Sequence, residues 1–378
     1  MVNKKELLKL VLRSLHRQGF HYSKGHLLPP ESQDKNTIRS MHAQAVAHKV
    51  SKSTGSFRNK EDKLLAEFAE GREVEPFRVY PKLVEIQPGS DDELLFRYAK
   101  LHWSIPVSAG YGRRLRFLVK DENNGKLIGL FGLADPVISL PGRDAWVGWT
   151  SEQREQRLMH VMDAFVLGSV PPYSFLLGGK LTAMMVSSNE VRNAFKRKYA
   201  GHQTMIRKRD FDGRLALVTT TSALGKSAIY DRIRFEQRLL YEGVGFTEGW
   251  GEFHFSDGVY GELLKYANRY CDPTRRNLEW GGEAFRNKRE VVMKVLPKLG
   301  LPREWLFHGV RREIFVVPLA KNARQFLRGE HARLCWYDQT ADDLFRFYRM
   351  RWLIPRSERD LRWRTWDPEC WRLFGTES

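Results

Sequence analysis

The chain has 378 residues, 42% of them hydrophobic, and a formal net charge of +18. This composition excludes a wholly disordered chain, and the lack of an apolar run of about 20 residues argues against a membrane-spanning helix. Cys271, Cys335 and Cys370 show no CxxC spacing, which excludes a disulfide framework and argues against a structural zinc finger. We therefore expect a cytoplasmic protein with a polyanionic partner, nucleic acid rather than a membrane surface.

Residues 1–60 form a first basic region, with 12 Lys/Arg against three acids. Asn3-x-x-Glu6 is a capping pair ahead of leucines at helical spacing, and a second helix is predicted over about 37–48. On one face of this second helix lie Lys35, Arg39, His42 and Lys49, which either contact phosphates or form a solvated surface. Residues 51–56 are predicted to be a flexible linker.

From residue 113 the pattern changes to strands. Alternating apolar residues over 115–119 and 126–131, with Asn124-Gly125 between them, predict a β-hairpin. A further extended segment is expected over 145–149, followed by an apolar run at 164–167. The loop over 110–114 ends in Arg113 and Arg114 and combines glycines with an aromatic side chain, which suits a stacked base beside a phosphate or a simple loop.

A glycine turn, Gly178-Gly179-Lys180, precedes a long predicted helix over 181–199. Free N–H groups and the positive dipole end at a helix N-terminus favour a phosphate, although two glycines before a helix are also a common tight turn. A P-loop is excluded because Thr220 stands where the first glycine ahead of Gly225-Lys226-Ser227 is required.

Residues 181–240 form a second basic region, with 12 Lys/Arg against five acids. Six of these cations flank a predicted loop at the end of the long helix: Lys196, Arg197, Lys198, Arg207, Lys208 and Arg209. They exceed what one helix C-terminus needs for its dipole, so contact with a polyanion is the favoured interpretation.

The order hairpin, strand, strand, glycine-started helix, strand, short helix with a tyrosine resembles the GNAT acyltransferases. In that family the glycine-started helix after the fourth strand holds the acyl-CoA pyrophosphate, which implies Gly178, Gly179 and Lys180 here. A tyrosine on the short helix after the fifth strand often acts as general acid, which implies Tyr230. The strict Q/R-x-x-G-x-G/A loop of the family is absent. The resemblance implies acyl-CoA as a cofactor.

Other candidate catalytic groups are acidic or paired with a cation. Arg143 and Asp144 either orient a substrate or form a structural ion pair in a turn. A nuclease would need carboxylates that share Mg²⁺, and none of the available ones falls in a recognised metal spacing: Asp135, Asp144, Asp163 and Asp231. Because no His/Cys cluster marks zinc either, no metal site is predicted.

Several ordered strings resemble the Druantia anti-phage system protein DruA family. They include the residues at 103–114, Ala134-Asp135-Pro136-Val137, Arg143-Asp144, Pro171-Pro172-Tyr173-Ser174, the run 219–230, 245–250 and His308-Gly309-Val310-Arg311-Arg312. The resemblance extends from the helix with Lys35 to about Gly329. It implies a component of a multi-gene bacterial defence against phage, with other subunits of that system as partners.

The sequence predicts an α/β (α+β) fold: a GNAT-like mixed sheet, an N-terminal basic helical segment and a C-terminal helical extension. The expected domains are 1–75, 76–260 and 261–378. In the last, tryptophans interleaved with arginines either stack bases or pack on the core, and packing is favoured. The expected function is nucleic-acid binding, DNA rather than RNA, in phage defence. The chain could be a GNAT-like enzyme that modifies nucleic acid, a non-catalytic recognition subunit, or a metal-dependent nuclease.

Overall fold

A mixed seven-stranded sheet organises the fold. The computed structural model describes residues 3–108, 110–203, 208–274, 284–285 and 287–375. The sheet strands are β3 (Pro81–Glu85), β4 (Arg114–Asp121), β5 (Leu127–Ala134), β6 (Val161–Ser169), β7 (Leu217–Thr221), β10 (Glu242–Phe246) and β11 (Glu313–Pro318). Two short hairpins stand apart: β1 (His21–Ser23) with β2 (His26–Leu28), and β8 (Arg234–Phe235) with β9 (Arg238–Leu239). This confirms the mixed α/β prediction.

The strand order is β10-β11-β7-β6-β5-β4-β3, and all neighbours are antiparallel except β6 and β7. The parallel pair runs only from Val161 opposite Leu217 to Asp163 opposite Thr219. Beyond this point β6 continues to Ser169 beside β5, and β7 continues beside β11. β4, β6 and β7 all begin at the same end of the sheet. We call this end of the strands the Arg114 edge, after the first residue of β4.

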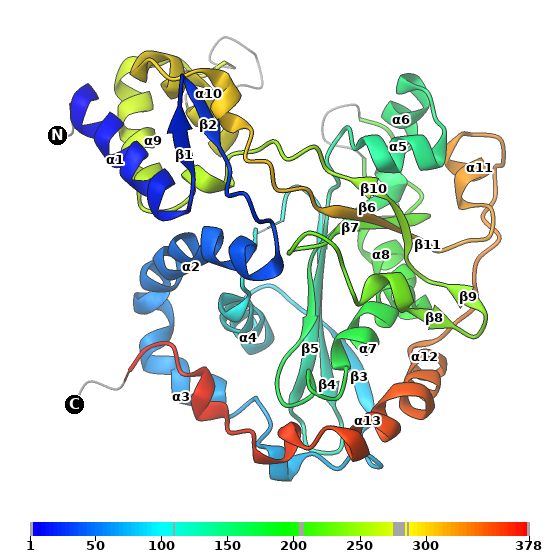
Figure 1. The fold of residues 1–378 in the computed structure, drawn as a ribbon. Helices are drawn as coiled ribbons and strands as arrows, with labels where there is room; N and C mark the ends of the chain where they lie inside the picture. The colour runs from blue at the N-terminus through cyan, green and yellow to red at the C-terminus, as the bar shows by residue number, and fades with distance from the viewer. Residues whose placement is uncertain (1–2, 109, 204–207, 275–283, 286, 376–378) are drawn as a thin grey trace.

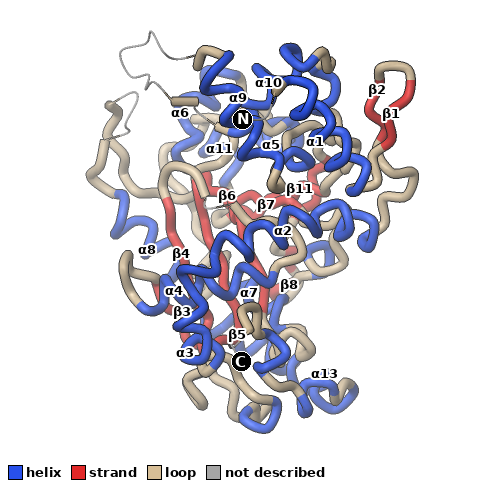
Figure 2. The backbone as a smooth tube through the Cα atoms, turned by 90° about the vertical axis from the view of Figure 1, so that its left-hand side faces the viewer, coloured by secondary structure: helices blue, strands red, loops and turns tan. Residues whose placement is uncertain are grey.

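Helices cover both faces of the sheet. One face packs against α7 (Gly178–Met185), α8 (Asn189–Tyr199) and α12 (Ala341–Tyr348). The other packs against the end of α2 (Lys35–Phe57), α3 (Glu61–Leu65) and α4 (Asp91–Ala99), which lie in front of the strands in Figure 2. Every residue of β5 is buried, as expected for a central strand covered on both sides.

A second group of helices has its own hydrophobic cluster. It combines α1 (Lys4–Arg17), the first half of α2, α9 (Val259–Tyr270) and α10 (Lys288–Leu299), and with the β1–β2 hairpin it lies above the sheet layer at the upper left of Figure 1. Leu7 and Val11 of α1 pack with Leu263 of α9 and Val295 of α10. The N-terminal helix thus shares one core with helices that lie far along the chain, while the predicted domain boundaries stay a prediction.

The remaining helices close the Arg114 edge and the opposite end. Val147 of α5 (Pro141–Val147) packs with Phe326 of α11 (Ala323–Leu327) against Val161 and Leu217, while α6 spans Ser151–Arg157 and α13 spans Ile354–Arg359. The C-terminal segment packs on the core as predicted: Trp363 is buried, and Trp336, Trp352, Trp366 and Trp371 are all half-buried. Of the described helices, none is long and apolar enough to cross a membrane.

Three local predictions are wrong. The predicted linker at 51–56 is helical and belongs to α2. The expected extended segment at 145–149 falls largely on α5, which has Pro141 at its start and ends at Gly148 in the left-handed conformation (φ 73°). The single long helix over 181–199 is two helices, because Ser188 caps a new start by accepting a hydrogen bond from the Val191 N–H.

Candidate functional site

The C-terminal end of α8 lies against the first residue of β4. The Tyr199 hydroxyl donates to the Arg114 carbonyl oxygen (2.7 Å) and accepts from the Arg114 N–H (2.8 Å). Lys196, Arg197 and Lys198 are exposed in the last turn of α8, and the Arg114 side chain is exposed at the start of β4. Arg197 pairs with Glu85 at 2.9 Å but keeps 66% of its side chain exposed. Two sets of predicted cations therefore meet at the Arg114 edge.

The segment after α8 returns to the same place. The Gly201 N–H donates to the Phe211 carbonyl and the Phe211 N–H to the His202 carbonyl, which holds both ends of the segment next to α8. Lys208 is exposed here, while Arg209 donates to the Glu155 carbonyl and pairs with its carboxylate at 3.6 Å. Arg207 lies outside the described residues. Lys208 thus adds an exposed cation to the segment that follows α8.

Arg113 differs from its neighbour because its guanidinium is used within the fold. It pairs with Asp135 (2.6 Å) and donates to the carbonyls of Met159 (2.7 Å) and Val161 (3.4 Å). Three aromatic rings, those of Phe195, Tyr199 and Phe211, lie 5.4–5.7 Å from its guanidinium carbon. Arg113 therefore connects β4, β5 and α8 at the Arg114 edge rather than facing solvent.

The cations at the start of α2 lie elsewhere. Lys35 and Arg39 are exposed, but α2 packs here against the loop after β7: a Cβ at Gly225 would lie 3.4 Å from Ile38. That loop is at the edge opposite Arg114. His42 is buried, its ring 4.3 Å from Phe253 and its Nε2 3.1 Å from Arg312. Burial, with the Arg312 charge, lowers the pKa of His42 to about 3. The start of α2 therefore lies apart from the second basic region, and His42 faces the interior.

Arg143 is fully buried, and its donors are used within the chain. Nε donates to Asp144 (2.8 Å), Nη1 to the Val137 carbonyl and Nη2 to the Ile138 carbonyl, both at 2.9 Å. Asp144 also accepts from the Leu140 N–H and from the Arg154 and Trp149 side chains. This network fixes the loop between β5 and α5, as a structural ion pair does.

The proposed cofactor turn is closed by its own chain. The Gly178 N–H donates to the Tyr173 carbonyl (2.9 Å) and the Lys180 N–H to the Leu177 carbonyl (2.8 Å). A Cβ at Gly178 would lie 2.8 Å from the Tyr173 carbonyl oxygen, so close packing alone requires glycine there. The Lys180 ammonium lies 5.1 Å from the Trp352 ring centroid. Because two amides of the turn are already bonded, these residues do not fit a bound pyrophosphate.

Tyr230 lies on a 3₁₀ turn after β7. Its ring stacks on Tyr241 at 5.0 Å and meets Phe315 edge-on at 5.2 Å, and burial raises its pKa. Among the described residues its hydroxyl has no hydrogen-bond partner.

Asp163 is a titratable group that the sequence identified only as an available carboxylate. It is the last residue of β6 that pairs with β7, it accepts a hydrogen bond from the Thr219 hydroxyl at 2.7 Å, and burial raises its pKa to about 6. Its place at the junction of the two parallel strands could not be read from the sequence. In the described parts of the chain, no three His, Cys, Asp or Glu side chains could together hold a metal ion.

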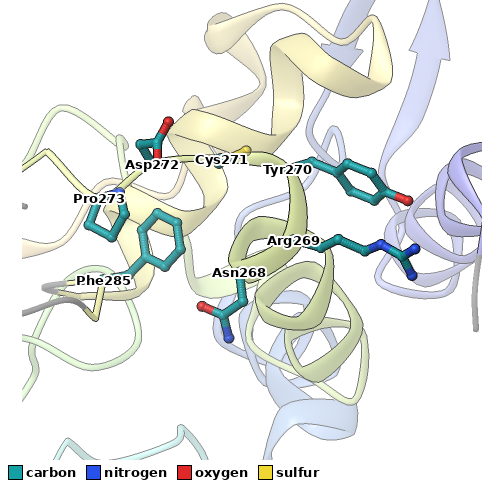
Figure 3. Close-up of a pocket in the computed structure, with 7 residues that line it drawn as sticks. All are labelled: Asn268, Arg269, Tyr270, Cys271, Asp272, Pro273 and Phe285. Carbon is teal, nitrogen blue, oxygen red and sulfur yellow. The ribbon is translucent and has the colours of Figure 1, made fainter.

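A cavity of about 410 Å³ lies at the end of α9, between Asn268 and Phe285. In Figure 3, Phe285 lies towards Pro273, while Arg269 and Tyr270 extend to the other side. None of the predicted site residues lines this cavity.

Comparison with known proteins identifies a family. The profile of Druantia protein DruA matches residues 32–329. A protein of Escherichia coli (strain UMEA 4076-1), described as Druantia protein DruA, is 36% identical over 362 residues, which cover 96% of this chain and 89% of that protein. No solved structure matches the chain.

Proposed function

Because the chain belongs to the Druantia DruA family, we propose that it is a nucleic-acid-binding component of a multi-gene bacterial defence against phage. We expect DNA rather than RNA as its ligand and other subunits of the system as its protein partners. The observation that carries the binding proposal is the meeting of exposed cations from α8, β4 and the segment after α8 at the Arg114 edge: Arg114, Lys196, Lys198 and Lys208.

Exposed cations on three structural elements suit a phosphate backbone. Each contact with a phosphate releases condensed counterions, so affinity comes with a steep dependence on salt concentration. Arg197 is partly neutralised by Glu85, whereas no carboxylate lies within 4 Å of Lys196 or Lys198 among the described residues. These two lysines are therefore the sharpest probes of the interface.

The test is the double charge reversal Lys196→Glu with Lys198→Glu. Binding to labelled single- and double-stranded DNA is measured as a function of salt concentration. We expect weaker binding and a salt slope smaller by about 0.9 for each duplex phosphate that the variant no longer neutralises. The matched control reverses Arg359 and Arg364, which are exposed in the C-terminal segment. Affinity and slope equal to those of the control variant would reject the proposed interface.

A GNAT-like enzyme that modifies nucleic acid is a second candidate, favoured by the strand order. The fourth strand of the sheet along the chain, β6, leads to the glycine-started α7, and the fifth, β7, leads to the turn with Tyr230. The closed turn at Gly178 argues against acyl-CoA. A thermal-shift screen with acetyl-CoA, nucleotides and Mg²⁺ tests this candidate: a shift with acetyl-CoA supports it, and its absence together with DNA binding favours a non-catalytic recognition subunit. A shift with Mg²⁺ would instead favour the nuclease alternative.

A further inference from the structure

Two half-buried lysines lie on the sheet face covered by α2 and α4, where the 3₁₀ turn Lys100–His102 contacts α2. Lys49 belongs to α2, and its ammonium group donates to the carbonyl of Val107 in the loop that leads to β4. Lys100 follows α4, and its ammonium lies 5.9 Å from the Phe96 ring centroid. The charges of Lys49 and Arg114 both act on Lys100. Three elements distant in sequence thus bring these cations together.

In the part of the chain that the structure describes, these cations have no paired carboxylate. Among the described residues, no carboxylate lies within 4 Å of Lys49, Lys100 or Arg114. On the same face, Lys120 pairs with Asp92 (2.9 Å) and Glu67 (3.2 Å), and Arg116 pairs with Glu93 (2.6 Å). The fold therefore neutralises neighbouring cations at this sheet face and leaves this group unpaired.

The other charged groups around the two lysines are mostly positive. Besides Lys49 and Arg114, the charges of Arg97 and Arg116 act on Lys100. The charge of Lys288 in α10 acts on Lys49, and Lys288 is itself near Glu252. Burial and these like charges lower the pKa of both lysines to about 8. Unpaired charges that are partly removed from water destabilise a fold, and an anion placed between them would relieve that cost.

We propose that Lys49, Lys100 and Arg114 form a binding site for one phosphate of a nucleic-acid backbone. The inference rests on the proposed function and extends it. The backbone of Arg114 bonds to Tyr199 at the end of α8, whereas its side chain points to the sheet face of Lys100 and Arg116. A chain of phosphates that passes from α8 around the start of β4 would therefore reach the two lysines next. An isolated phosphate group shares the same chemistry, and the experiment separates the two sources.

The experiment compares wild-type protein with Lys100→Met and Lys49→Met in DNA binding and in thermal unfolding. Each variant should bind several-fold more weakly, with a salt slope smaller by about 1. Each should also unfold at a higher temperature than wild type, because methionine fills a similar volume without an unpaired charge. The matched control is Lys321→Met, an exposed lysine before α11, which should change neither property.

The outcomes separate this inference from the function on which it rests. If Lys196→Glu with Lys198→Glu weakens DNA binding but Lys100→Met leaves it unchanged, this inference alone is overturned. A wild-type protein that binds no DNA would overturn both. A further result would be that inorganic phosphate stabilises the wild-type protein against heat but not Lys100→Met, while DNA binding of the variant is unaltered. That result would assign the site to a free phosphate instead. A lower unfolding temperature with an unaltered salt slope would show that the lysines are structural.

Discussion

Arg113 and Arg114 are neighbours in the sequence, yet the fold uses them in opposite ways. Arg113 bonds to Asp135 and to the carbonyls of Met159 and Val161, whereas only the backbone of Arg114 is bonded, and its side chain is exposed. The same contrast separates Arg143, which pairs with the Asp144 carboxylate, from Lys49 and Lys100, which pair with no carboxylate among the described residues. Cations that pair with carboxylates and carbonyls of the chain hold loops in place, whereas cations without a carboxylate partner are available to a ligand.

The largest effect on stability is expected where a buried, paired cation loses its carboxylate partner. Asp144→Ala leaves the buried Arg143 guanidinium without its carboxylate, which should lower the free energy of unfolding by about 3–5 kcal/mol. Urea denaturation measures this change. Asp231→Ala, at an exposed carboxylate, is the control and should stay within about 0.5 kcal/mol of wild type. A decrease below about 1 kcal/mol for Asp144→Ala would mean that Arg143 is not held in this way.

The adjacent arginines provide a matched pair. Arg113→Met should lower the free energy of unfolding by about 1–3 kcal/mol, because Asp135 is left without its partner; the salt slope of DNA binding should not change. Arg114→Met should leave stability within about 0.5 kcal/mol and reduce that slope by about 1. Denaturation and salt titration of both variants measure the two effects, and the reverse assignment would break the comparison.

A smaller effect is expected in the pH dependence of stability. The pKa of Lys49 and of Lys100 is lowered from 10.5 to about 8 in the folded state. Between these values the unfolded chain binds more protons, so the free energy of unfolding should rise as pH increases from about 8 to 10.5. The double variant Lys49→Met with Lys100→Met should lose this rise. A parallel pH dependence in both proteins would mean that the lysines are not desolvated.

Local signals in the sequence predicted the elements that depend on neighbouring residues. The Asn124-Gly125 hairpin between β4 and β5 is confirmed, as is the cap of α1, where Asn3 and Glu6 bond reciprocally. The prediction is wrong at 51–56, because serine and threonine are common in linkers but also occur in helices when their hydroxyls bond to backbone carbonyls. In α2, the Ser53 hydroxyl bonds to the Lys49 carbonyl, the Thr54 hydroxyl bonds to the Ser51 carbonyl, and the buried Phe57 anchors the helix end beside Tyr98.

By itself, the sequence determined the mixed α/β class, the family, and the two regions that carry most of the net charge. It could not separate Arg113 from Arg114, or identify Lys100 at all, because charge is a property of the residue whereas pairing depends on residues far along the chain. Asp135, Met159 and Tyr199 decide which arginine is buried and which is exposed. Only the tertiary structure brought Lys49, Lys100 and Arg114 together without a carboxylate, because α2, α4 and β4 meet only in the folded chain.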